Sequence, residues 1–234
     1  MVVPTGIAGL DKILGGGLPE KTTILLKGPP GCGKTTLSQQ FLYSGLKKSE
    51  PGFYITLDSS PDDVAKTMEK FKWDVKPHMK KKKLYFLDAY SWKAGGGKKS
   101  ENVKVIDGGL DINAINLSIA EIFEKIDADS NRGVFDSLST LLLYTPPELV
   151  VRFIPMMIAK SKKANSTQIL ILEEGVHDEK IVNTISYMVD GVINIKMEGN
   201  KRQIQISKIK GANCSRDWFT INLTDKGLVV HGNK

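Results

Sequence analysis

The residues with the clearest chemical purpose form a short glycine-rich segment near the N-terminus. Residues 28–35 read Gly-Pro-Pro-Gly-Cys-Gly-Lys-Thr and fit the pattern G-x-x-x-x-G-K-[ST]. In this pattern glycines let backbone N–H groups turn inward around a phosphate chain, the lysine reaches the β- and γ-phosphates, and the hydroxyl ligates Mg²⁺. Pro29 and Pro30 have no N–H, so the donors must come from residues 31–36. The residues expected to bind phosphates are Gly28, Gly31, Cys32, Gly33, Lys34, Thr35 and Thr36.

The segments on either side of this loop predict the elements that position it. Residues 22–27 are apolar and partly β-branched, which is typical of a strand buried on both faces. Residues 37–46 carry apolar side chains at helical spacing. The free N–H groups and the dipole at the start of that helix favour a bound anion. We therefore expect a nucleoside-triphosphate site with Mg²⁺, rather than a glycine-rich turn that contains a lysine by chance.

Length and composition indicate an ordinary globular protein. The chain has 234 residues, of which 41% are hydrophobic and 25% charged, so we expect one domain over residues 1–234. The two cysteines, Cys32 and Cys214, do not form a disulfide framework. No basic-then-apolar leader is visible, and proline and charged residues interrupt the most apolar stretch, residues 138–158. We expect a cytoplasmic protein with no membrane span.

The net charge of +7 permits contact with nucleic acid or acidic lipid without requiring either. Part of this charge is a run of four lysines, residues 80–83, which we interpret as a solvated turn between a helix and a strand.

Strands and helices alternate along the chain. This pattern predicts an α/β fold with a mostly parallel central sheet flanked by helices. Two later pairs of strands are separated by short turns, which predicts antiparallel strands at the C-terminal edge. The predicted strands are 53–57, 84–87, 134–135, 168–172, 192–195, 204–207, 219–223 and 228–230, and the predicted helices are 113–126, 147–162 and 179–187.

Four of the predicted parallel strands are followed by a carboxylate. In open parallel sheets, ligands bind at the carboxyl ends of the strands, where the phosphate loop also lies. We therefore expect one of these carboxylates to hold the magnesium, although such residues also serve as helix caps. The carboxylates are Asp58, Asp88, Asp136 and the pair Glu173-Glu174.

Three segments resemble KaiC-like ATPases of the RecA superfamily, which are widespread in archaea. Residues 5–19, Thr-Gly-Ile-Ala-Gly-Leu-Asp-Lys-Ile-Leu-Gly-Gly-Gly-Leu-Pro, are similar to the segment that precedes the phosphate loop in that family. Residues 190–193 and 219–230 are similar to its C-terminal part, so the resemblance covers nearly the whole chain. It implies a RecA-like P-loop NTPase fold that binds ATP. AAA+ proteins share the loop but usually carry a glutamate after the magnesium-binding aspartate, where this chain has Ser137.

The resemblance implies roles for two further carboxylates. Asp136 would hold Mg²⁺ through water, beside Thr35; the alternative is a helix cap. The family usually has a water-activating Glu-Glu pair at the end of the strand that follows the phosphate-loop helix, where this chain has Asp58-Ser59. Because Asp58 is one methylene shorter and a general base must reach its water, we expect ATP binding with slow hydrolysis. Glu173 or Glu174 could substitute as the base or sense the γ-phosphate.

The resemblance also implies an assembly. Lys208 and Lys210 match a family Lys-x-Arg motif that contacts nucleotide bound by the neighbouring subunit. Lys210 keeps the charge of the arginine but loses its forked geometry. The alternative is two solvated lysines on an edge strand. The motif predicts a homo-oligomer, such as a hexameric ring, with ATP between subunits.

Three functions follow from these expectations. The first is a slow oligomeric ATPase with a regulatory or signalling role, and the second is a non-hydrolysing nucleotide switch that docks a protein partner. The third is a DNA-binding recombination accessory protein, in which Trp92, Lys98 and Lys99 of the long loop 89–110 grip a single strand. Plain disorder of that loop is the alternative to the third.

Overall fold

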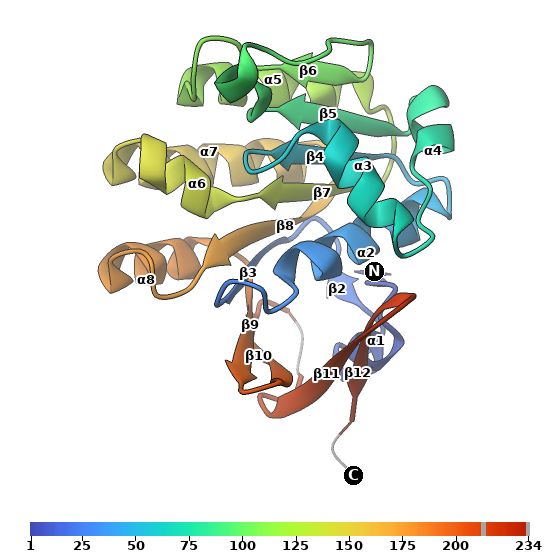
Figure 1. The fold of residues 1–234 in the computed structure, drawn as a ribbon. Coiled ribbons are helices and arrows are strands. Elements are labelled where there is room, and N and C mark those ends of the chain that lie inside the picture. Colours follow the sequence, from blue (N-terminus) through green and yellow to red (C-terminus); the bar gives the residue numbers. More distant parts are fainter. Residues whose placement is uncertain (212–213, 233–234) are drawn as a thin grey trace.

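A ten-stranded mixed sheet forms the centre of the molecule (Figure 1). A computed structural model of the chain describes residues 1–211 and 214–232. The strand order across the sheet is β12-β11-β10-β9-β3-β8-β7-β4-β5-β6. Seven of these are mutually parallel: β3 (Thr23–Gly28), β4 (Gly52–Thr56), β5 (Leu84–Asp88), β6 (Val103–Val105), β7 (Asn131–Asp136), β8 (Ser166–Glu173) and β9 (Gly191–Glu198).

The C-terminal strands extend the sheet in antiparallel fashion, as predicted. β9 pairs with β10 (Lys201–Ile209), β10 with β11 (Trp218–Thr224), and β11 with β12 (Gly227–His231). A β-bulge between Ile206 and Lys208 shifts the register of β10 against β9. The predicted α/β fold with antiparallel edge strands is therefore confirmed.

Helices cover both faces of the sheet because the central strands are apolar on both sides (Figure 1). Leu25 packs with the helices of one face, whereas its neighbours Ile24 and Leu26 pack on the other. α1 (Ala8–Ile13), α2 (Lys34–Leu46), α3 (Pro61–Glu69) and α4 (Lys76–Lys80) lie on one face. α5 (Ile112–Lys125), α6 (Leu138–Tyr144), α7 (Pro147–Lys163) and α8 (Glu179–Met188) lie on the other.

Several short elements escape sequence-based prediction. The first twenty residues form α1 and a small antiparallel pair, β1 (Val2–Val3) with β2 (Leu18–Pro19). The long loop after β5 contains a 3₁₀ turn, η1 (Ser91–Ala94), and the edge strand β6. These elements are too short for hydrophobic periodicity to reveal them. No helix within residues 1–211 and 214–232 combines the length and apolarity needed to cross a membrane.

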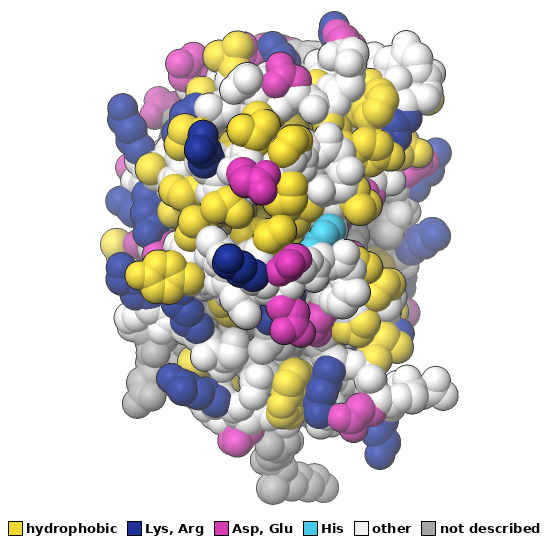
Figure 2. Space-filling model, turned by 90° about the vertical axis from the view of Figure 1, so that its left-hand side faces the viewer, with side chains coloured by type: hydrophobic (Ala, Val, Ile, Leu, Met, Phe, Trp, Pro, Cys, Tyr) yellow, Lys and Arg dark blue, Asp and Glu magenta, His cyan; other side chains and the backbone are white. Residues whose placement is uncertain are grey.

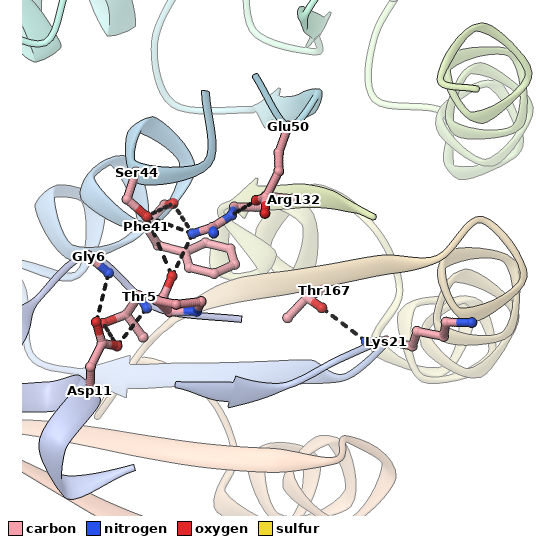
Figure 3. A network of polar contacts seen from close by, with 10 residues as sticks. Thr5, Gly6, Asp11, Lys21, Phe41, Ser44, Glu50, Arg132 and Thr167 are labelled. Atoms are coloured by element: carbon pink, nitrogen blue, oxygen red, sulfur yellow. Dashed lines mark hydrogen bonds and ion pairs between the residues drawn. The ribbon is translucent and has the colours of Figure 1, made fainter. Parts of the chain in front are cut away.

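The N-terminal segment forms a turn that lies against α2 (Figure 3), and Gln40 of α2 donates from Nε2 to the carbonyl of Gly6 at 3.1 Å. The Asp11 carboxylate accepts hydrogen bonds from the backbone N–H and hydroxyl of Thr5, both at 2.6 Å, and from the N–H of Gly6 at 3.2 Å. Gly6 has φ +79°, and a Cβ there would lie 2.3 Å from the Cβ of Ser44 in α2. The signature residues Thr5, Gly6 and Asp11 therefore shape a tight turn against the helix.

A fully buried arginine secures the same region from the sheet side (Figure 3). Arg132 of β7 donates from Nε to Glu50 at 2.6 Å. Its Nη1 donates to the carbonyls of Pro4 and Phe41, at 2.7 and 2.9 Å, and to the Ser44 hydroxyl at 2.6 Å. Arg132 thus ties the N-terminal segment, α2 and the sheet together.

Candidate nucleotide site

The phosphate loop lies between β3 and α2, as its flanking segments predict. Gly31 and Gly33 have φ of +73° and +106°, a backbone conformation that favours glycine. Gly33 is the N-cap of α2. Gly28 stands so close to β9 that a Cβ would lie 2.3 Å from the carbonyl oxygen of Ile195. The loop glycines are thus required by backbone geometry.

Lys34 points back into its own loop. Its Nζ donates to the carbonyls of Gly28 and Pro29, at 2.9 and 2.8 Å, and to Glu173 Oε2 at 2.8 Å. The Lys34 side chain is only 3% exposed. Glu173 comes from β8, where it pairs in register with Gly28. The ammonium group is therefore fully hydrogen-bonded, and a carboxylate balances its charge.

The Cys32 side chain faces the core rather than the loop. It is fully buried among apolar residues on the α2 side of the sheet. Burial raises the pKa of its thiol, and the nearby Lys34 opposes that rise. Only its backbone N–H can therefore take part in the phosphate binding predicted for this residue.

The two predicted magnesium-binding residues lie together at the end of β7. The Asp136 carboxylate is buried and accepts a hydrogen bond from the Tyr54 hydroxyl at 2.6 Å. Burial raises the pKa of Asp136 to about 6; hydrogen bonds from Tyr54 and Thr35 oppose the rise, whereas the nearby Asp58 and Glu173 carboxylates add to it. Within the described residues no group of three or more His, Cys, Asp or Glu side chains could hold a metal ion. One carboxylate and one hydroxyl suit Mg²⁺, which takes its remaining ligands from waters and phosphates.

Replacing Asp136 by asparagine should stabilise the nucleotide-free protein at neutral pH. The folded-state pKa, about 6, exceeds the ordinary value of 3.8, so the folded state binds the extra proton and stability falls as pH rises between these values. Above pH 6 the asparagine should raise the free energy of unfolding by on the order of 2 kcal/mol, with little change at pH 4. Urea unfolding from pH 4 to 8 measures this. A pH profile that stays parallel to wild type, as expected for the exposed control Asp127→Asn, would contradict it.

The remaining strand-end carboxylates differ in what holds them. Asp58 follows β4 and is exposed, and its two oxygens accept hydrogen bonds from the hydroxyls of Ser137, at 2.9 Å, and Thr140. Asp88 is buried, and its Oδ1 accepts from the backbone N–H groups of Tyr90 and Ser91. Asp88 is therefore occupied by the backbone that leads into η1, whereas Asp58 lies at the edge of the site and is oriented by hydroxyls at the start of α6.

A cavity of about 220 Å³ opens over the phosphate loop. Sequence reasoning missed its far wall, which Arg202, Leu223 and Leu228 of the C-terminal strands provide. Arg202 shares a sheet face with the buried Ile204, an alternation that is visible in the sequence. Its Nε is buried and has no hydrogen-bond partner among the described residues. The cavity is lined by Gly31, Gly33, Lys34, Thr35, Thr36, Glu173, Arg202, Leu223 and Leu228.

The two lysines of the Lys-x-Lys segment lie outside this cavity. Lys208 Nζ donates to the carbonyls of Ser186, Tyr187 and Val189, at 3.2, 3.1 and 2.7 Å, at the C-terminus of α8. Lys210 follows the end of β10 and is exposed. The structure does not bring either lysine to its own phosphate loop, and their contact with a neighbour's nucleotide stays a prediction.

The long loop after β5 already uses two of its lysines. Lys93 lies over the rings of Tyr90, Trp92 and Tyr144, with Nζ 5.0–5.9 Å from the ring centroids. Lys99 forms an ion pair with Asp107. These contacts give no specific support to the single-strand grip predicted for Trp92, Lys98 and Lys99.

Comparisons with known proteins point in one direction. The family model described as "ATPase: KaiC" matches residues 3–234. A UPF0273 protein of Pyrococcus horikoshii is 36% identical over 239 residues, covering 99% of this chain and 94% of that protein. A UPF0273 protein of Thermotoga maritima is 33% identical, covering 98% and 95%. The crystal structure of a KaiC-like protein of Pyrococcus horikoshii superimposes with a TM-score of 0.81 and 25% identity, covering 99% of both chains.

Proposed function

The chain belongs to the KaiC family of ATPases, and from this premise we propose that it binds Mg–ATP at the phosphate loop, hydrolyses it slowly and acts as an oligomer. One observation supports the proposal above all: Lys34, Thr35 and Asp136 converge at the carboxyl edge of the sheet, beside a cavity. Bound Mg²⁺ would neutralise charge on the phosphates there. The chain has only two cysteines, and so few cysteines fit a protein of the reducing cytoplasm.

Binding of the triphosphate would reorganise one ion pair. The backbone N–H groups of residues 31–36 would surround the phosphates, and Lys34 would exchange Glu173 for the phosphate oxygens. Thr35 and Asp136 would hold Mg²⁺ directly and through water. Glu173, once released, would face the γ-phosphate end of the site. There it could act as the base or sense the γ-phosphate.

The far wall of the cavity would hold the nucleoside end of the ligand. Arg202 offers a planar guanidinium with an unused buried donor, and Leu223 and Leu228 offer apolar surface. A guanidinium can stack on a purine or pair with a phosphate. The C-terminal strands would thus complete a site that the phosphate loop begins.

Replacing Asp58 by glutamate should raise multiple-turnover ATP hydrolysis on the order of tenfold, because a longer side chain extends the base toward its water. Asp58→Asn is the matched control, since it keeps hydrogen-bonding capacity toward Ser137 and Thr140 but removes the base. Phosphate release at saturating Mg–ATP measures both. A glutamate variant no faster than wild type would exclude Asp58 as the base. Tight ATP binding with no turnover in any variant would favour the non-hydrolysing switch.

An apolar face supports assembly. Figure 2 shows hydrophobic side chains gathered on the side of the molecule where α6 and α8 lie in Figure 1. The end of α6 and the start of α7 contribute Leu143, Tyr144 and Leu149, which are 71%, 56% and 44% exposed. An exposed apolar patch is typical of a surface that another chain covers.

We expect Mg–ATP to drive this assembly, because Lys210 would contact nucleotide held by the neighbouring subunit. Lys210→Gln should raise the protein concentration needed for half-assembly about tenfold, the effect of losing one charge-assisted hydrogen bond. Lys226→Gln, which replaces another exposed lysine, serves as the control. Sedimentation velocity with and without Mg–ATP measures assembly. A monomer in both conditions, with nucleotide bound, would contradict the assembly.

A further inference from the structure

The positive charge of this chain is concentrated in two segments. The sequence contains 33 basic and 26 acidic residues. Residues 47–50 and 64–83 together contain ten lysines and three acidic residues, which leaves 23 of each sign in the rest of the chain. The net charge of +7 therefore resides in these two segments, although they make up a small part of the molecule.

The fold places the two segments side by side. The Tyr43 ring of α2 stacks on Trp73, with centroids 6.0 Å apart, and meets the edge of His78 at 6.1 Å. The N–H of Gly52 donates to the carbonyl of Lys83 at 2.8 Å. The end of α2 and α4 lie on the side of the molecule opposite the phosphate loop, and α3 runs toward that side (Figure 1).

Seven of these lysines form what we call the lysine surface. Lys66, Lys76 and Lys82 pair with Asp63, Glu69 and Glu101 and are not counted in it. The other seven form no ion pair within residues 1–211 and 214–232, and all but the partly buried Lys83 are exposed. The lysine surface consists of Lys47, Lys48, Lys70, Lys72, Lys80, Lys81 and Lys83.

The composition of the lysine surface restricts its partner. No large hydrophobic side chain between residues 43 and 83 is exposed, and Trp73 is buried. Protein interfaces rely on aromatic and arginine anchors, membrane surfaces take up exposed apolar side chains, and single strands need aromatic platforms; the lysine surface offers none of these. It contains no arginine for bidentate contact with base edges. What remains is a set of point charges suited to a regular array of phosphates.

We propose that the lysine surface binds the phosphate backbone of a nucleic-acid duplex without regard to sequence. Such binding relies on lysine–phosphate contacts that release counterions, and it positions a protein without reading bases. The inference is independent of the nucleotide site, because α2 separates the two sites by about 20 Å, the length of its 13 residues. Loss of ATP binding would therefore leave duplex binding intact.

Fluorescence anisotropy with labelled 30-base-pair DNA and RNA duplexes of random sequence, over a range of salt concentrations, tests this. Wild type should bind, with log affinity falling against log salt at a slope of about −4.5 to −6.3, as expected when five to seven phosphates are neutralised. Lys47→Gln/Lys48→Gln/Lys80→Gln/Lys81→Gln should make the slope shallower by three to four and lower affinity at least tenfold in low salt. Equal affinity for the DNA and RNA duplexes would indicate that backbone charge alone is recognised. A higher affinity for one of them would show that the lysine surface also fits the spacing of phosphates in that duplex.

The control variant removes the same charge from elsewhere: Lys12→Gln/Lys163→Gln/Lys180→Gln/Lys226→Gln, four exposed lysines without ion pairs among the described residues. The proposal fails if this variant loses as much affinity as the first. It also fails if wild type binds no duplex at low salt, or binds only single strands, acidic vesicles or acidic proteins.

Lysine acylation mapped by mass spectrometry on wild type provides a second measurement, in which duplex must protect Lys47, Lys48, Lys80 and Lys81. Unprotected lysines would overturn the assignment even if a variant misfolds.

Discussion

Replacing Lys34 by methionine should weaken ATP binding on the order of 100-fold. The Lys34 ammonium lies inside the phosphate loop, where it would form charge-assisted hydrogen bonds to the β- and γ-phosphates. Losing such bonds costs about 3 kcal/mol, which corresponds to that factor. Isothermal titration with Mg–ATP measures the loss.

Two controls separate the charge of Lys34 from its effect on Glu173. Lys27→Met removes a nearby lysine that faces Glu174 at 3.9 Å, outside the loop, and should bind ATP as wild type does. Lys34→Met/Glu173→Gln removes the unpaired carboxylate that the single variant leaves behind. If the double variant regains full affinity, the loss came from Glu173 repelling the phosphates, and the proposed contact from Lys34 would be wrong.

Replacing Arg132 by methionine should lower the free energy of unfolding by about 3–5 kcal/mol. The side chain is fully buried, and its removal leaves the Glu50 carboxylate, the carbonyls of Pro4 and Phe41, and the Ser44 hydroxyl without their donor. Buried acceptors that lose their partner bear the full cost of desolvation. Chemical denaturation measures this change, and the transition should shift without a change in slope.

Glu50→Gln provides the matched control for Arg132. Glu50 is partly exposed, so the amide can still accept from Arg132 while the rest of the network stays in place. We expect it to cost no more than about 1–2 kcal/mol. If Arg132→Met costs as little as Glu50→Gln, the network would be redundant and the N-terminal segment would be held by its apolar contacts alone.

Much of the candidate site follows from local rules of sequence. The pattern of residues 28–35, with a strand before it and a helix after it, predicts the phosphate loop, and the carboxyl ends of parallel strands predict that Asp136 meets Thr35. Alternating apolar runs predict the antiparallel strands at the C-terminal edge. These features depend on residues that are neighbours in the chain or on strand order that the fold class dictates.

The features that sequence reasoning missed depend on contacts between distant elements. Two lysines two positions apart suggest a shared direction, but β10 ends at Ile209, so Lys208 belongs to the strand and Lys210 lies beyond it. Lys208 instead donates to the carbonyls at the end of α8, a use that no local pattern encodes. Tyr54 reads as one more apolar strand residue, and only the folded sheet brings its hydroxyl to Asp136.

The turn formed by Thr5, Gly6 and Asp11 has a consequence for how members of this family are recognised. Their hydrogen bonds to one another shape a turn that packs against α2, and none of the three residues lines the cavity. The signature by which such chains are identified is therefore a piece of scaffolding. The positions that would govern turnover and communication between subunits in the proposed function, Asp58 and Lys210, lie elsewhere in the chain. A substitution at Asp58 or Lys210 would thus leave the turn by which the chain is identified untouched.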